Sequence, residues 1–137
     1  MSRQNQIIDR EEIASLGASL RQINPKLLKN SSVSGKSRLW YQGDEPYFDV
    51  IFELENDELI WFQFTLRSKS LSWDRKKKLL QTGLTDEFKI NDVSFYPASK
   101  TIEQDAENDC KFVALVKSIL ETRSQEKIFA TALVLFH

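Results

Sequence analysis

The chain has 137 residues, with 19 Lys and Arg against 20 Asp and Glu, a net charge of −1, one cysteine and one histidine. These values are typical of one globular domain over residues 1–137 that needs no disulfide, and the near-neutral charge gives no general attraction to nucleic acid or to anionic lipid. The single cysteine, and a start without a charged-then-apolar leader, indicate a cytoplasmic protein without export.

The first predicted element is a helix, whose apolar residues recur every three or four positions: Ile13, Leu16, Leu20 and Ile23. Asp9 can cap its first amides, with Glu12 three residues later as the reciprocal partner of a capping box. Because Pro25 disfavours helical geometry at Asn24, the helix is expected to end there.

Three antiparallel strands are predicted next, at about 37–42, 47–55 and 58–67, where aromatic and β-branched residues are dense. Apolar side chains alternate along the second and third of these strands. This alternation predicts a core face made by Phe48, Val50, Phe52, Leu54, Ile60, Phe62, Phe64 and Leu66.

The register of this hairpin follows from the alternation. A strict two-residue loop at 56–57 would pair Leu54 with Leu59, a core residue with a surface residue. We therefore expect a three-residue loop over 56–58. The pairs that this loop predicts are Leu54 with Ile60 and Phe52 with Phe62 on the core face, and Glu53 with Trp61, Asp49 with Thr65 and Tyr47 with Arg67 on the other.

The second half of the chain is less regular. A fourth short strand is predicted at 70–73, a basic turn or short helix at 74–81, a loop at 82–86 and an edge strand within 88–96. Thr101 followed by Gln104 has the capping-box pattern and predicts a helix to about Arg123, with Cys110 on its apolar face. Ser124 can cap the apolar segment 126–136, which fits a buried helix or a strand, and we favour the helix.

Together these elements predict an α+β fold: an N-terminal helix, an antiparallel meander of three to five strands, and one or more C-terminal helices packed on one sheet face. The arrangement is similar to that of secretion chaperones and of immunity proteins that neutralise toxins. This resemblance is one of architecture, and it implies a small protein that binds another protein.

The residues for several common active sites are missing from the sequence. The one imidazole is His137 at the C-terminus, so a Ser-His-Asp triad and a zinc site of His and Cys lack their parts. The glycines match neither nucleotide-binding pattern. We therefore expect no cofactor and no metal.

The predicted binding surface is the outer face of the sheet, where large apolar residues stand in place of the Lys, Thr and Glu of a solvent face. Its candidate residues are Tyr47, Asp49, Ile51, Glu53, Leu59, Trp61 and Arg67. Three alternatives could account for this apolar face: it is covered by another layer of the chain itself, it binds a protein partner or a second copy of the chain, or it forms a groove for a small-molecule ligand.

Charge is divided between two neighbouring segments. From Asp44 to Glu58 the chain has seven acids and no base, whereas from Arg67 to Lys78 it has six bases and one acid. The acidic hairpin would steer a basic partner. The basic segment has the ingredients of a single-stranded nucleic-acid surface in Trp73, Arg75, Lys76, Lys77 and Lys78. A solvated turn that offsets the acidic hairpin is the simpler interpretation, and the acidic pI counts against nucleic acid.

The primary hypothesis is a non-enzymatic, cytoplasmic protein-binding module whose partner is another protein, basic in charge, or a second copy of the chain. One alternative is a metal-dependent hydrolase or nuclease that uses Asp49, Glu53 and the segment 87–89. A second alternative is nucleic-acid binding through the basic turn. No membrane partner is expected, because the longest apolar stretch, 128–136, has about half of the roughly 20 residues that a span requires.

Overall fold

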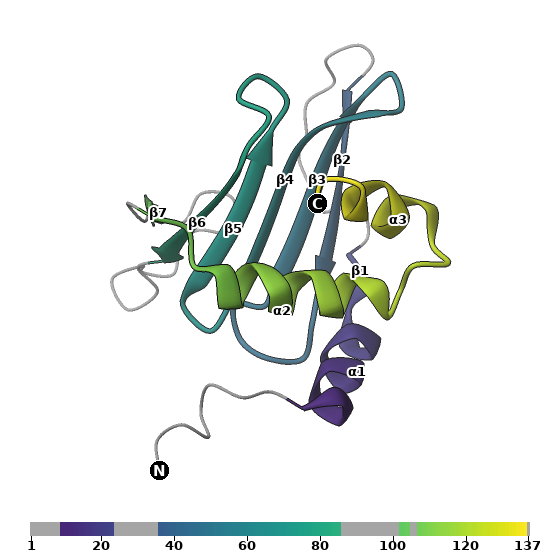
Figure 1. Cartoon of the computed structure of the whole chain (residues 1–137). Coiled ribbons are helices and arrows are strands. Elements are labelled where there is room, and N and C mark those ends of the chain that lie inside the picture. Colours follow the sequence, from purple (N-terminus) through teal and green to yellow (C-terminus); the bar gives the residue numbers. More distant parts are fainter. Residues whose placement is uncertain (1–8, 24–35, 86–101, 105–106, 137) are drawn as a thin grey trace.

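The computed structural model describes residues 9–23, 36–85, 102–104 and 107–136 (Figure 1). Its elements are α1 (Arg10–Ser19), β1 (Arg21–Gln22), β2 (Lys36–Gln42), β3 (Asp49–Glu55), β4 (Glu58–Leu66), β5 (Lys69–Asp74), β6 (Leu80–Thr85), β7 (Ile102–Gln104), α2 (Cys110–Glu121) and α3 (Lys127–Leu133). The strands form one seven-stranded antiparallel sheet in the order of the sequence. The predicted α+β fold is confirmed, with more strands than the three to five expected.

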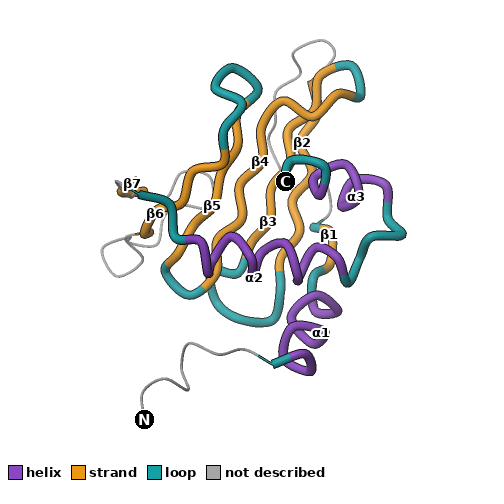
Figure 2. The backbone as a smooth tube through the Cα atoms, in the orientation of Figure 1, coloured by secondary structure: helices purple, strands orange, loops and turns teal. Residues whose placement is uncertain are grey.

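Helices α2 and α3 lie across one face of this sheet, and α1 packs beside α2 at one end (Figures 1 and 2). We call this face the helix face and the opposite one the outer face. Seven of the eight predicted core residues lie in or against the core, and Phe52, Phe62 and Phe64 are fully buried. The prediction is wrong for Ile60, which is partly exposed and lies outside the core. The rings of Tyr41, Phe52 and Phe129 meet at 5.0 to 5.9 Å between centroids and join β2 and β3 to α3.

The predicted register is confirmed in the middle of the β3–β4 hairpin. Phe52 pairs with Phe62 and Glu53 with Trp61. At the turn, however, the prediction is wrong: Leu54 pairs with Leu59.

The reason is a β-bulge next to a two-residue turn. Asn56 and Asp57 both have left-handed backbone angles, with φ of 52° and 69°, as a tight hairpin turn requires. The register shifts between Glu53 and Leu54, and the extra residue that the bulge absorbs brings Leu59 onto the helix face, where it is 7% exposed. The alternation of the two strands was therefore compatible with the short turn.

The ends of two helices also differ from the prediction. Asp9 caps α1 through a hydrogen bond from the Glu12 amide, as expected, but the helix ends at Ser19 because β1 begins directly after it. The long helix begins at Cys110, and Gln104 belongs to a strand. Thr101 and the segment 88–96 lie outside the described residues.

The N-terminal end of α2 is set by contacts with the neighbouring strand. The Asn108 side chain accepts from the Thr82 amide at 2.9 Å and donates to the Leu80 carbonyl at 2.8 Å, so it supports β6 where a loop had been predicted. Asp109 caps α2 by accepting from the Phe112 amide at 3.1 Å. Downstream, α3 confirms the helix favoured for the last segment, although its N-cap residue is Glu126 and no side chain caps it.

Candidate functional site

Three residues of the predicted outer-face site are packed within the chain. Ile51 is on the outer face but only 2% exposed, and Leu59 belongs to the core of the helix face. Asp49 is 4% exposed and accepts a hydrogen bond from Trp40 Nε1 at 3.0 Å. Their assignment to an exposed docking surface is therefore corrected: burial removes all three from contact with a partner.

The predicted cross-strand pair of Tyr47 and Arg67 does not form, because both residues lie outside the strands. Both residues have left-handed angles, with φ of 61° and 51°, and lie in the turns that flank β3 and β4. Arg67 instead donates from Nε to Glu45 at 2.9 Å and from Nη2 to Glu12 at 2.8 Å. The hydrogen bond from Arg67 holds the pKa of the Glu45 carboxyl below its usual range. These two ion pairs of Arg67 join α1 to the β2–β3 and β4–β5 turns.

Two predicted residues remain partly exposed on the outer face, Glu53 and Trp61. Arg38 interacts with both of them. Its guanidinium lies 5.7 Å from the centroid of the Trp61 ring, and its Nη2 lies 3.7 Å from Glu53 Oε2. The indole face that was expected to anchor a partner is thus already in contact with a cation of the chain itself. What remains of the predicted site is an intramolecular cluster.

A buried amide lies beside this cluster. Gln63 pairs with Ile51 on one side and Ser72 on the other and is 3% exposed. Its Nε2 has no hydrogen-bond acceptor among the described residues. Because a buried donor without a partner costs about 1 to 3 kcal/mol, Gln63→Met is expected to raise the free energy of unfolding by about 1 kcal/mol. Urea denaturation measures this change, with the exposed Gln22→Met as the control; a loss of stability at Gln63 would show that its amide has a partner.

The acidic hairpin is largely neutralised within the chain. Arg75 reaches Glu55 at 2.9 Å and Glu58 at 3.6 Å, because β5 pairs with β4 and brings the basic turn beside the hairpin end. Asp57 alone among the hairpin-end acids has no ion partner within the described residues. The division of charge seen in the sequence therefore reflects mutual pairing, as the interpretation of an offsetting turn expected.

The three lysines that follow Arg75 do not pair with the acids of the hairpin. Lys76, Lys77 and Lys78 are exposed and form no ion pair with any residue in the described ranges. The turn itself is well defined, since Asp74 Oδ1 accepts from the Lys76 amide at 2.7 Å and Lys78 has a left-handed φ of 54°. These three lysines outnumber Asp57 and Asp74, the acids at this end of the sheet that have no ion partner among the described residues, so the unpaired charge there is net positive.

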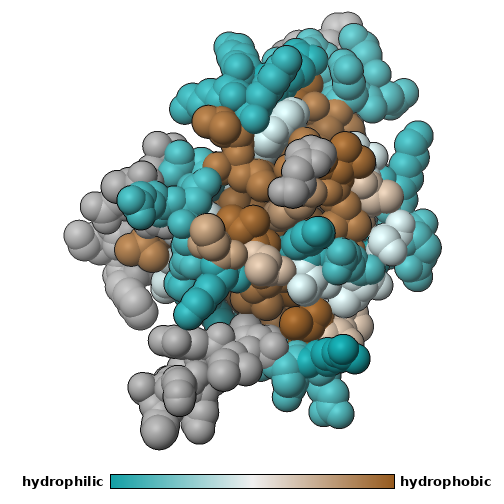
Figure 3. Space-filling view, in the orientation of Figure 1, coloured by the Kyte–Doolittle hydropathy of each residue, from teal (hydrophilic) through white to brown (hydrophobic). Residues whose placement is uncertain are grey.

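Apolar residues flank these lysines in the β5–β6 hairpin. Trp73 pairs with buried Phe62 and with Leu80, so it shares the helix face with them; both Trp73 and Leu80 are partly buried against the core. Leu79 is 65% exposed directly after the lysines. Figure 3 shows hydrophobic residues gathered on this face with hydrophilic ones along its border. We call Trp73, Leu79, Leu80 and Lys76–Lys78 the lysine-rimmed patch.

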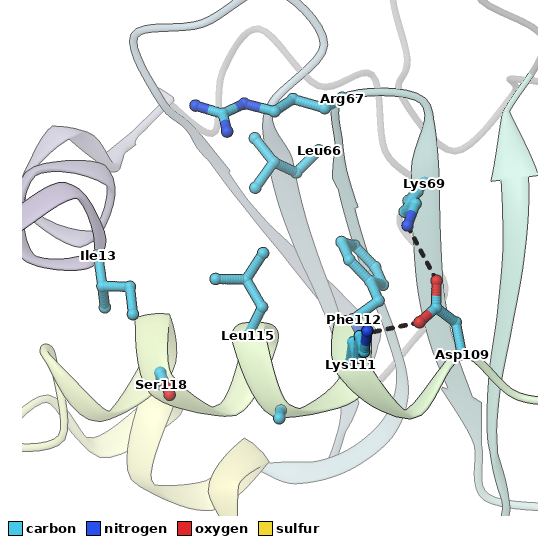
Figure 4. Close-up of a pocket in the computed structure, with 10 residues that line it drawn as sticks. Ile13, Leu66, Arg67, Lys69, Asp109, Lys111, Phe112, Leu115 and Ser118 are labelled. Carbon is cyan, nitrogen blue, oxygen red and sulfur yellow. Dashed lines mark hydrogen bonds and ion pairs between the residues drawn. The ribbon is translucent and has the colours of Figure 1, made fainter. Parts of the chain in front are cut away.

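A cleft of about 610 Å³ lies at the other end of the sheet, between α1, α2 and the β4–β5 turn (Figure 4). Leu66, Phe112, Leu115 and Ile13 supply apolar surface, while Arg67, Lys69, Asp109 and Lys111 line it with charge. Asp109 binds Lys69 Nζ at 2.9 Å, and this contact lowers the pKa of the Asp109 carboxyl. The sequence offered no signal for this cleft, since its residues come from three distant segments.

Two residues of the hydrolase hypothesis have partners within the chain. Asp49 is bound to Trp40 and Glu53 to Arg38, and the segment 87–89 lies outside the described residues. Within the described ranges, no group of three or more His, Cys, Asp and Glu side chains is arranged to hold a metal ion. Cys110, expected on an apolar face, is exposed at the first position of α2.

Comparison with known proteins provides no relative for this geometry. No protein-family model matches the chain, and neither a curated protein nor a solved structure is significantly similar to it. Among the helices of the described part, none has the length and apolar character needed to cross a membrane.

Proposed function

We propose that this protein is a non-enzymatic binding module that holds an acidic, amphipathic segment of another protein on the lysine-rimmed patch. One observation carries the proposal: three lysines without ion partners among the described residues directly precede Leu79, which is 65% exposed, in a hairpin whose Trp73 and Leu80 are partly buried. Such a combination favours a ligand with an apolar face and carboxylates along its edge.

The two parts of the patch have different roles in this proposal. Trp73 and Leu80 are partly buried and held in place by the sheet, so burying their remaining surface costs little side-chain entropy. Leu79 supplies most of the apolar area that a partner can newly remove from water. The lysines raise the association rate for an acidic segment and set its orientation.

Binding fits the ionisable groups better than acid–base catalysis does. Burial raises the pKa of Tyr41, and the hydrogen bond that Arg67 donates to Glu45 raises the pKa of Arg67. The pKa values of Glu45 and Asp109 are lowered by their bonds to Arg67 and Lys69. All four shifts move away from neutrality, whereas a general acid or base works best with a pKa near the ambient pH.

A protein segment fits the patch better than a nucleic acid does. Trp73 packs against the core and does not stand free for a base to stack on both sides, and Arg75 is bound to Glu55 and Glu58. A single-stranded site combines stacking rings with a positively charged groove that follows the phosphates. Three lysines beside aliphatic residues match carboxylates on an apolar helix more closely.

The proposal predicts binding of a short synthetic helical peptide with leucines on one face and glutamates on the other. Fluorescence anisotropy of the labelled peptide should show saturable binding to the wild-type chain. We expect Lys76, Lys77 and Lys78 changed together to Gln to weaken it about tenfold at low salt, and Leu79→Ser to weaken it by a similar factor through lost apolar burial. The matched control changes the exposed Lys36, Lys117 and Lys127 to Gln.

Three results would contradict the proposal. Equal loss of affinity in the two triple-lysine variants would reduce the effect to net charge. Preferential binding of an oligothymidylate, abolished by the same three changes at 76–78, would assign the turn to nucleic acid. A stable dimer in sedimentation equilibrium that Leu79→Ser dissociates would assign the patch to a second copy of the chain.

A further inference from the structure

The cleft between α1 and α2 is a second candidate site, separate from the lysine-rimmed patch. Its apolar floor combines Leu66 and Phe112, 1% and 4% exposed, with the partly exposed Leu115 and Ile13. Figure 4 shows these side chains directed into the space between the helices and the β4–β5 turn. A volume of about 610 Å³ falls within the range of roughly 300–1,000 Å³ found for small-molecule sites.

Three cations and one acid line this cleft, and their partners differ. Arg67 is bound to Glu45 and Glu12, and Lys69 is bound to Asp109. Lys111 is exposed and forms no ion pair with a described residue. Lys111, at the N-terminal end of α2, is therefore the one charged lining residue without an ion partner among the described residues.

The lining is also elongated. Lys111, Leu115 and Ser118 lie at helical spacings of four and three on α2, which places them along one side of that helix over roughly 10 Å. The charged residue stands at one end of this row and Ile13 of α1 lies toward the other (Figure 4). The cleft thus has a cationic end and an apolar length.

We propose that the cleft binds an amphipathic carboxylate, a fatty-acid-like molecule whose acyl chain lies on Leu66, Phe112 and Leu115 and whose carboxylate meets Lys111. Charge complementarity selects the head group. A carboxylate forms a charge-assisted hydrogen bond with the Lys111 ammonium, whereas an uncharged head group leaves the ammonium without an ion partner. The tail is selected by Leu115 and Ile13, because an acyl chain lying over the buried Leu66 and Phe112 removes the exposed surface of these two residues from water. The cleft shares no residue with the lysine-rimmed patch, so this proposal can be tested independently of the proposed function.

Isothermal titration with decanoate, kept below its micelle concentration, tests the proposal on the intact chain. We expect one saturable site, with affinity about tenfold lower in Lys111→Gln and unchanged in Lys117→Gln, an exposed lysine of the same helix that does not line the cleft. Decanol should bind about tenfold more weakly than decanoate to the wild-type chain, and the two should bind alike to Lys111→Gln.

A second variant tests the tail. Ser118→Phe adds a ring to the cleft wall and should reduce decanoate binding by more than tenfold, with circular dichroism confirming that the variant is folded. The proposal would be overturned by the absence of saturable binding, by equal effects at Lys111 and Lys117, or by decanoate binding that Ser118→Phe leaves unchanged. Peptide affinity at the lysine-rimmed patch should be the same in all three variants.

Discussion

Gly43→Ala is expected to lower the free energy of unfolding by about 3 kcal/mol, one of the two largest effects predicted for this fold. A Cβ at this position would lie 2.1 and 2.5 Å from Cδ2 and Cε2 of the Phe48 ring. That ring is fully buried and lies 5.7 Å from the Phe64 ring, so it has no space to withdraw. Denaturation by urea, followed by far-ultraviolet circular dichroism, measures the loss.

Gly17→Ala provides the comparison, because its added Cβ meets a more adaptable neighbour. The nearest atom is the Thr122 hydroxyl at 1.9 Å, which can rotate away, and alanine is the better helix former within α1. We therefore expect a smaller loss at Gly17 than at Gly43. The opposite order would mean that the Phe48 ring is not held as tightly as its packing indicates.

Arg123→Met is expected to cost about 3 kcal/mol. The guanidinium donates from Nη1 to the carbonyls of Gly17 and Leu20, at 2.7 and 2.8 Å, at the C-terminal end of α1. It also lies 5.2 Å from the centroid of the Phe129 ring and binds Glu126. Methionine keeps the apolar volume but leaves both partly buried carbonyls without this charged donor.

Thermal denaturation of three variants separates the geometry of Arg123 from its charge. Arg123→Lys should lose an intermediate amount, since an ammonium retains the charge without the planar fork that reaches two carbonyls and a carboxylate. Lys127→Met, at an exposed position nearby, should leave the melting temperature unchanged. If Arg123→Met melted with the wild type, α1 would be held by apolar packing alone.

Much of the fold could be predicted from local patterns. The alternation over Phe48–Leu54 and Phe62–Leu66 placed the core on the correct face, because one buried sheet face imposes a period of two. Asp9 marked the start of α1, since capping depends only on residues within one turn. Sequence patterns succeeded where the determining interactions lie within a few residues.

The errors arose where distant residues decide the local structure. Thr101 and Gln104 have a capping-box pattern, yet the helix begins at the Asp109 cap, next to the Asn108 bonds to β6. The bulge that turns Leu59 inward depends on the core that receives it. Neither contact has a signature in a short window of sequence.

The predicted outer-face surface is partly buried and paired within the chain for a similar reason. Charges can be counted in a sequence, but their partners cannot: Arg75 meets Glu55 and Glu58 only because β4 pairs with β5. That pairing leaves the lysines at 76–78 without ion partners among the described residues, and the partner that we propose for them is acidic where the sequence had predicted a basic one. The face on which Trp73 lies could have been predicted from the sequence. Trp73 is two residues after the buried Leu71, so the alternation of side chains along a strand places both on the helix face.

The most direct measurement is a titration of the ¹⁵N-labelled chain with the leucine–glutamate peptide, followed by amide and indole chemical shifts. Binding to the lysine-rimmed patch predicts saturable shifts at the Trp73 indole, Leu79 and Leu80, with the Trp61 indole unchanged. Shifts centred on Trp61 and Arg38, or no saturation at millimolar peptide, would contradict the assignment of this surface.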